Sequence, residues 1–279
     1  MTHLTNILLL HPGEMGSSIA ANLKSSNHTV YWVSRGRSLD TQKRAQDAGI
    51  AAVADLNEGL AVADMVFSIC PPEAALELAT DVRGRGFENL YMDANATSPD
   101  TALQISDLFG QNYVDGGIIG PPATRPRTTR LYLSGMRRVE VAELFQGTLV
   151  GAVPLDEQNS SASALKMCYA SYTKGTSALL LALRALAEYH GITEALLSEW
   201  SISQPGLEQR SSNTAPGTSR KGWRFTGEML EISKTYSEAG LPGDFHQAAA
   251  EIYRRMTPFK DQEPAQLEQV IEVLLDRKK

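Results

Sequence analysis

The chain has 279 residues, of which 42% are hydrophobic and 21% are charged, and its formal net charge is −6. This length suits one large domain or two of ordinary size, and the composition is that of a globular protein with a buried core, which excludes a disordered chain. The mildly acidic balance offers no general electrostatic surface for nucleic acid or an anionic membrane, so any phosphate site must be local.

Targeting and metal-binding signals are missing from the sequence. The start has neither the basic residues nor the long apolar core of a signal peptide, and no stretch approaches the ~20 apolar residues that span a bilayer. The two cysteines, Cys70 and Cys168, lie in apolar stretches and are predicted to be buried core thiols. No CxxC or HExxH spacing occurs, so we predict no metal site. A reducing, cytoplasmic setting fits best, with no nucleic-acid or membrane partner.

The first half of the chain alternates short apolar runs with segments typical of helices. Predicted strands cover residues 6–10, 29–33, 50–54, 65–70, 90–93, 113–117, 131–134 and 149–153. Predicted helices cover residues 17–25 and 73–83, and another begins at Ser98-Pro99 and runs towards Phe109. Strands that alternate with helices of this length predict a mostly parallel sheet with both faces covered.

The pattern changes near Pro154. Residues 160–189 are rich in Ala and Leu and contain no proline, which predicts one long helix ended by His190-Gly191. The remainder is predicted to be helical, with polar breaks at residues 211–220 and 240–243. We therefore predict an α/β fold: a Rossmann-type dinucleotide-binding domain over residues 1–155, followed by an all-α domain over residues 156–279.

The first turn of the chain, residues 11–16, reads HPGEMG. In the dinucleotide fingerprint G-x-G-x-x-G, His11 takes the first glycine position. Gly13 still allows the backbone to approach a pyrophosphate, and Gly16 still allows the helix to pack closely on the strand. The predicted contacts with the cofactor come from Pro12, Gly13, Glu14 and Met15. The alternative is a structural turn in a protein that has lost its cofactor, and His11 keeps that alternative open.

The end of the second predicted strand distinguishes NADP from NAD. NAD-binding proteins usually carry an acidic residue about 20 residues past the turn. This chain has Ser34, Arg35 and Arg37 there, and no carboxylate before Asp40. Two guanidinium groups with nearby hydroxyls can hold a 2′-phosphate through charge-assisted hydrogen bonds. The loop therefore predicts NADP, with an ordinary solvated basic loop as the alternative.

Lys166 lies among small and apolar residues of the long predicted helix. A lysine on a mostly buried helix face must lose its charge or find a partner, and an amine so placed is suited to proton exchange. Tyr169, Ala170 and Thr173 follow at spacings that place them on the same face. The alternative is a lysine that extends its amine to solvent at the edge of an interface, and composition does not choose between the two.

Three further features carry weaker signals. Residues 115–122 read DGGIIGPP, and such a loop after a strand can face a substrate, although a tight turn explains it nearly as well. His190 is interpreted as the cap of a helix end. His246 has no obvious partner in the sequence.

Taken in order, these motifs resemble a known family. HPGEMG, SRGRS, ICPPEAA, DANATSP and DGGIIGPP precede a lysine on the first interdomain helix. The chain is similar to the β-hydroxyacid dehydrogenase superfamily, which includes 6-phosphogluconate, 3-hydroxyisobutyrate and tartronate semialdehyde enzymes. The resemblance extends over nearly the whole chain. The C-terminal half is most similar to a subgroup with its own phosphogluconate-dehydrogenase-like C-terminal domain.

The resemblance implies roles for particular residues. Lys166 matches the catalytic lysine, a general base in alcohol oxidation and an acid in carbonyl reduction. The implied cofactor contacts are Cys70, Pro71, Pro72 and Asn95, and the implied substrate contacts are Thr97, Gly116, Gly117, Ile118, Tyr169 and Thr173. The resemblance also implies a homodimer that exchanges helical domains and an active site between the domains.

Two departures from the family pattern leave the substrate open. Ala170 stands where the family often has an asparagine that positions substrate, and a later lysine expected after Phe225 is not evident. The leading hypothesis is an NADP-dependent dehydrogenase or reductase that acts on a small hydroxy acid or related carbonyl compound. The alternatives are an imine reductase on the same scaffold and a non-catalytic NADP-binding sensor.

Overall fold

The computed structural model describes residues 4–276 and contains two compact units that divide between Met167 and Cys168. An eight-stranded, mostly parallel sheet with flanking helices makes up the first unit, and the second is helical, so the predicted fold class is confirmed. The predicted boundary at residue 155 falls between strand β8 (Val150–Pro154) and helix α7 (Ser161–Tyr189). The two compact units divide after Met167, beyond residue 155, because the first turn of α7 is hydrogen-bonded to the sheet.

The sheet has the strand order β3-β2-β1-β4-β5-β6-β7-β8. Its remaining strands are β1 (Asn6–Leu10), β2 (Thr29–Val33), β3 (Ala51–Val53), β4 (Met65–Ser68), β5 (Leu90–Asp93), β6 (Tyr113–Ile119) and β7 (Thr129–Ser134). Pairing is parallel from β3 through β6, β7 is antiparallel to β6, and β8 is parallel to β7. The chain builds the sheet outward from β1 to β3 on one side and then from β4 onward on the other, so the strand order reverses between β1 and β4. Open α/β sheets bind nucleotides at such a point, beside the carboxyl ends of the strands.

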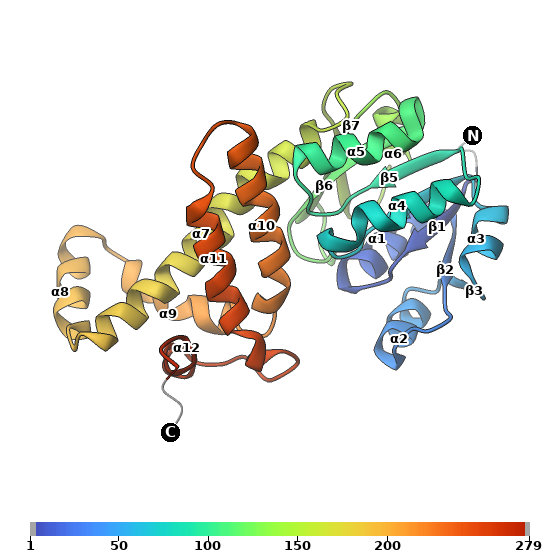
Figure 1. Ribbon diagram of the computed structural model, residues 1–279. Coiled ribbons are helices and arrows are strands. Elements are labelled where there is room, and N and C mark those ends of the chain that lie inside the picture. Colours follow the sequence, from blue (N-terminus) through green and yellow to red (C-terminus); the bar gives the residue numbers. More distant parts are fainter. Residues whose placement is uncertain (1–3, 277–279) are drawn as a thin grey trace. The chain divides into compact units, whose positions relative to one another are not determined.

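Helices cover both faces of this sheet (Figure 1). Their bounds are α1 (Glu14–Ser25), α2 (Leu39–Asp47), α3 (Leu56–Val62), α4 (Ala75–Gly84), α5 (Pro99–Phe109) and α6 (Arg138–Glu143), with short 3-10 turns at Pro72–Ala74 and Gly110–Asn112. Along each central strand, alternate side chains enter different cores. One core packs against α1, α2 and α6, and the other against α4 and α5. This explains the continuous apolar runs of the sequence, since parallel strands are buried on both faces.

The second unit consists of the rest of α7 and five further helices. These are α8 (Thr193–Ser203), α9 (Leu207–Thr218), α10 (Gly222–Glu238), α11 (Asp244–Arg255) and α12 (Leu267–Leu274), with a 3-10 turn at Thr257–Phe259. The predicted break at residues 240–243 separates α10 from α11. The predicted break at residues 211–220 is wrong, because α9 continues to Thr218 with Pro216 inside it. Buried Ser211 and Ala215 pack that polar-looking segment into the unit.

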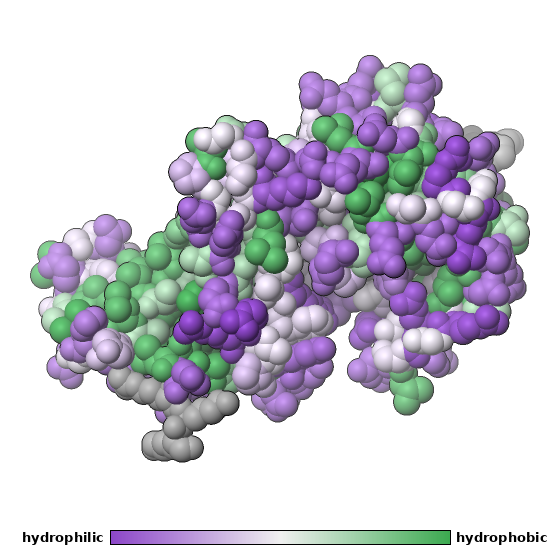
Figure 2. Space-filling model, viewed as in Figure 1, coloured by the Kyte–Doolittle hydropathy of each residue, from purple (hydrophilic) through white to green (hydrophobic). Residues whose placement is uncertain are grey.

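Hydrophobic surface extends along the C-terminal part of α7 (Figure 2). Cys168 lies nearer the start of α7; it was expected in the core but is exposed, because it occupies the outward face of the helix, whereas Cys70 is half-buried. Among residues 4–276, each helix is too short or too polar to cross a lipid bilayer.

Candidate active site

The turn between β1 and α1 keeps the geometry of the fingerprint despite His11. His11 adopts a left-handed φ of 76°, a conformation in which histidine is among the more frequent non-glycine residues. Its carbonyl accepts a hydrogen bond from the Gly13 nitrogen at 2.9 Å. A Cβ atom on Gly16 would collide with that same carbonyl oxygen, whereas one on Gly13 would meet nothing within 4 Å. Gly16 is therefore required by packing, and Gly13 leaves the start of α1 open to a ligand.

The backbone nitrogens at the start of α1 suit an anionic group. Gly13 is the N-cap of this helix, without a side-chain cap among the described residues, so the amides of the first turn can donate to a ligand. Pro12 is buried, while Glu14 and Met15 are half-buried. Burial, together with the positive charge of Arg37, lowers the pKa of His11 to about 4, so its imidazole is neutral at pH 7. These features fit a bound dinucleotide.

The loop between β2 and α2 carries the predicted 2′-phosphate residues. Arg35 is exposed, with its guanidinium 3.9 Å from the Asp55 carboxylate, and Arg37 is half-buried beside His11. Ser34 donates its hydroxyl proton to the carbonyl of Val53. Ser38 accepts a hydrogen bond from the Thr41 nitrogen and so caps α2. Both hydroxyls already have protein partners, which leaves the two guanidinium groups as the main candidates for a phosphate.

Arg44 is a further cation near this turn that the sequence analysis did not identify. Its side chain reaches back from α2 and donates to the carbonyl of Pro12 at 3.3 Å and to the hydroxyl of Thr41 at 3.0 Å. Arg44 is 32 positions after Pro12 in the sequence, so no local pattern indicates this contact.

Asn95 joins the loops that follow β4 and β5. Its Oδ1 accepts a hydrogen bond from the Cys70 nitrogen at 2.5 Å, and its Nδ2 donates to the Ser68 hydroxyl at 3.0 Å. The Asn95 nitrogen in turn donates to Asp93 at 2.8 Å. The side chain is thus committed to holding the Cys70–Pro72 loop in place, and a direct cofactor contact by Asn95 stays a prediction. Pro71 is exposed and Pro72 half-buried.

Lys166 approaches the carboxyl-terminal end of β6. Its Nζ donates to the carbonyl of Ile118 at 2.8 Å, and its side chain is half-buried. A Cβ on Gly117 would lie 2.6 Å from the carbonyl oxygen of Ala162 in the first turn of α7, and one on Gly116 would lie 3.0 Å from the Ala94 Cβ. The two glycines therefore allow close packing, and their role in binding substrate stays a prediction.

Two buried carboxylates lie side by side in the sheet. Asp93 and Asp115 pair in the β5–β6 register. Burial raises the pKa of Asp93 to about 7, with a further contribution from the charge of Asp115. Burial also raises the pKa of Asp115 to about 6, against the opposing effect of hydrogen bonds from Ser163 and Ser134.

The remaining predicted substrate residues are not brought together in one unit. Thr97 is buried in the loop just before α5, and its hydroxyl has no hydrogen-bond partner among the described residues. Tyr169 and Thr173 belong to the second unit; Tyr169 is 47% exposed, and Thr173 donates to the Tyr169 carbonyl at 3.1 Å. Their predicted contact with substrate is untested.

Comparison with known sequences identified a family model and a relative that each match part of this chain. A family model described as "Domain of unknown function (DUF1932)" matches residues 187–256, within the second unit. A relative from Methanothermus fervidus, described as an "Uncharacterized 28.5 kDa protein in 7S RNA 5′region", is 29% identical over 191 residues, which cover 66% of this chain and 72% of that protein.

Solved structures extend the likeness to the whole chain. The 3-hydroxyisobutyrate dehydrogenase of Mycobacterium tuberculosis, determined with L-serine, has a TM-score of 0.69 and 19% identity, covering 98% of this chain and 99% of that one. The chain has the fold of the 3-hydroxyacid dehydrogenases. The reductive aminase of Aspergillus terreus, in complex with NADPH and ethyl levulinate, shares it with a TM-score of 0.56 and 16% identity over 97% of this chain and 99% of that one. The resemblance to the β-hydroxyacid dehydrogenase superfamily is thus confirmed as a likeness of fold.

Within this dehydrogenase fold, sequence reasoning missed a polar cluster of the second unit. Buried His246 meets the Ser171 hydroxyl at 2.9 Å, and that hydroxyl also meets Tyr236 at 2.8 Å. Lys174 forms an ion pair with Glu228 and lies over the ring of Phe225, 4.3 Å from its centre. Ala170, where the family often has asparagine, is buried. Each of these contacts joins distant segments, which explains why His246 has no evident partner in the sequence.

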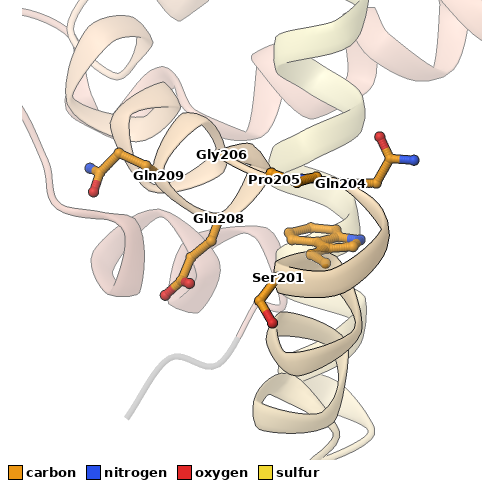
Figure 3. Close-up of a pocket in the computed structure, with 7 residues that line it drawn as sticks. Ser201, Gln204, Pro205, Gly206, Glu208 and Gln209 are labelled. Carbon is orange, nitrogen blue, oxygen red and sulfur yellow. The ribbon is translucent and has the colours of Figure 1, made fainter.

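A hollow of about 370 Å³ lies at the turn between α8 and α9 (Figure 3). It is lined by Trp200, Ser201, Gln204, Pro205, Gly206, Glu208 and Gln209. This lining includes none of the predicted site residues. Its one charged side chain, Glu208, would repel an anionic substrate or cofactor, so we do not place the active site there.

Proposed function

We propose that this chain is an NADP-dependent oxidoreductase that acts on a small hydroxy acid or a related carbonyl compound, with Lys166 as the proton carrier. The observation that carries the proposal is the anchoring of Lys166 to the Ile118 carbonyl at the carboxyl-terminal end of β6, in the same compact unit as the dinucleotide fingerprint. Support comes from the dehydrogenase and reductase neighbours, which have the same fold.

The bound nicotinamide would supply or accept a hydride. The chain itself must then deliver or remove one proton at the substrate oxygen, and a positioned acid or base contributes ~10²–10⁴-fold to such a step. A lysine ammonium can donate that proton in carbonyl reduction, and its neutral amine can accept it in alcohol oxidation. The Ile118 carbonyl holds the amine in one place before substrate arrives.

Two candidate reactions, on a carbonyl compound and on a C=N bond, differ in their substrate. The departure at Ala170 leaves the usual 3-hydroxy acids in question, and the reductive aminase with the same fold favours C=N reduction as a second candidate. Consumption of NADPH with a panel of carbonyl acids, compared with a panel of imines and of ketones mixed with amines, would distinguish them. Binding of NADPH without turnover in either panel would favour the sensor hypothesis and contradict the proposal.

Lys166→Met tests the proton carrier directly. Methionine retains the length of the side chain and removes the amine, so we expect normal thermal unfolding and normal NADPH affinity, with turnover reduced at least ~100-fold. The same change at Lys260, an exposed lysine of the second unit, controls for loss of charge and should leave turnover unchanged. Retained turnover in Lys166→Met would assign the proton to another group, and loss of folding would assign the lysine a structural role.

A further inference from the structure

The first turn of α7 is held by side chains that lie far away in the sequence. The backbone nitrogen of Ala162 donates to the Ser134 hydroxyl of β7 at 3.1 Å, and that of Ser163 donates to the Asp115 carboxylate of β6 at 2.8 Å. Nitrogens in the first turn of a helix have no partner within the helix. Here β6 and β7 satisfy them and thereby attach the helix to the sheet.

Asp115 is the centre of this attachment. Besides the Ser163 nitrogen, it accepts the Ser163 hydroxyl at 2.6 Å and the Ser134 hydroxyl at 3.0 Å. All of these residues are buried. A buried carboxylate is costly unless it is fully hydrogen-bonded, and well-packed apolar residues often serve stability as well or better. A stabilising role alone therefore explains this carboxylate poorly.

The same strand controls the helix around Lys166. Ser163 is three residues before Lys166, so both lie on one face of α7, one turn apart. Gly117 lets the Ala162 carbonyl pack against β6, and Ile118 accepts the Lys166 amine at 2.8 Å. Three contacts along β6, at Asp115, Gly117 and Ile118, thus set the position of the lysine along and around the helix axis.

We propose that Asp115 is a positioning residue for Lys166, which acts through Ser163 and Ser134 on the first turn of α7. This inference rests on the proposed function of Lys166 and adds that the accuracy of its placement depends on the Asp115 network. Misplacement of a reacting group by about 1 Å can cost ~10²-fold in rate. The network would therefore act on the chemical step without touching substrate or cofactor.

Amine labelling of the cofactor-free protein tests the inference without a known substrate. Sulfo-N-hydroxysuccinimide acetate is the probe, and peptide mass spectrometry compares the labelling rate of Lys166 with that of Lys260. In Asp115→Ala and in the milder Ser163→Ala, we expect Lys166 to label ~2–10-fold faster, the range expected when one hydrogen bond is lost. In Asp115→Asn, the amide oxygen can accept the bonds from the Ser163 nitrogen and the Ser134 hydroxyl, and the amide nitrogen can donate to the Ser163 hydroxyl. All three bonds can thus be retained, and Lys166 should label as in the wild type.

Ser171→Ala provides the matched control, because it also removes a buried hydroxyl from α7 but one bonded to His246 and Tyr236. It should leave Lys166 labelling unchanged. An unchanged rate in folded Ser163→Ala, or an Asp115→Asn variant that labels like Asp115→Ala, would overturn the inference. Thermal unfolding of each variant identifies any that fail to fold, and Ser163→Ala then decides the matter.

Turnover separates this inference from the function on which it rests. Ser163→Ala should lower kcat with NADPH affinity unchanged, and Asp115→Asn should restore most of what Asp115→Ala loses. If Lys166→Met abolishes turnover while Ser163→Ala and Asp115→Ala retain it in full, the positioning role is wrong and the proposed function stands. If Lys166→Met itself retains turnover, the proposed role of Lys166 as the proton carrier is wrong, whatever the result for Asp115.

Discussion

At the scale of single residues, the two glycines of the fingerprint turn have different roles. Gly16 faces the His11 carbonyl and has no room for a Cβ, whereas Gly13 faces open space. We expect Gly16→Ala to lower the free energy of unfolding by about 1–3 kcal/mol, the usual cost of an inserted methyl group in a packed site. Chemical denaturation measures this change.

Gly13→Ala is the counterpart of that substitution in the same turn. Its φ of −69° suits alanine, so we expect stability to change by less than about 1 kcal/mol. The added methyl group would lie where a pyrophosphate must approach the backbone, so NADPH affinity should fall by ~10-fold or more, equivalent to about 1.4 kcal/mol. A Gly13→Ala protein that binds NADPH as tightly as the wild type would contradict the assignment of this turn to the cofactor.

At the scale of an element, we propose that the loop between β2 and α2 selects NADP over NAD. Because Ser34 and Ser38 already have protein partners, selection depends on Arg35 and Arg37. Charge-assisted hydrogen bonds contribute about 1.5–3 kcal/mol, so Arg35→Ala and Arg37→Ala should each weaken NADPH binding by ~10–100-fold and leave NADH binding nearly unchanged. Titration with each reduced cofactor measures both affinities.

Arg85, the residue that follows α4, is a suitable control for these substitutions, because it pairs with Asp81 and Asn57 instead of facing the turn. Arg85→Ala should alter neither affinity. Equal affinity of the unmodified protein for NADPH and NADH would show that the arginines do not select the 2′-phosphate.

At the scale of the whole molecule, α7 exposes apolar side chains at heptad spacing. Tyr172 is 63% exposed, Leu179 43% and Leu186 54%. Residues seven apart fall near one line along a helix, and such a stripe is typical of a protein interface. We therefore expect a homodimer that buries this face, and the double substitution Leu179→Glu with Leu186→Glu should halve the mass measured by light scattering.

Leu103→Glu on α5 is the matched control for that charge, since Leu103 is 47% exposed but belongs to the first unit and is not part of the stripe. It should leave the mass unchanged. A stable species of about 30 kDa for the unmodified chain would contradict the dimer.

Local sequence determined most of the fold. A continuous apolar run predicted the buried strand at residues 6–10, because a parallel strand is covered on both faces. β-Branched and aromatic residues predicted the strand at residues 29–33. Proline-free, alanine-rich sequence predicted α7 to within a residue at its start, and Gly191 with its positive φ explains the end. The glycine spacing of the first turn and the paired arginines after β2 also pointed to a dinucleotide site, since those requirements are local to the backbone and to charge.

The tertiary structure alone determined how the site is held together. Asp115 lies 19 residues before Ser134 and 48 residues before Ser163, and only the pairing of β6 with β7 and the docking of α7 bring the three together. The same is true of Asn95 with Cys70 and of Arg44 with Pro12. Hydrogen bonds and close packing act over a few ångströms in space at any separation along the chain. A local pattern can therefore indicate which residues carry chemistry, but it does not show which residues hold them in position.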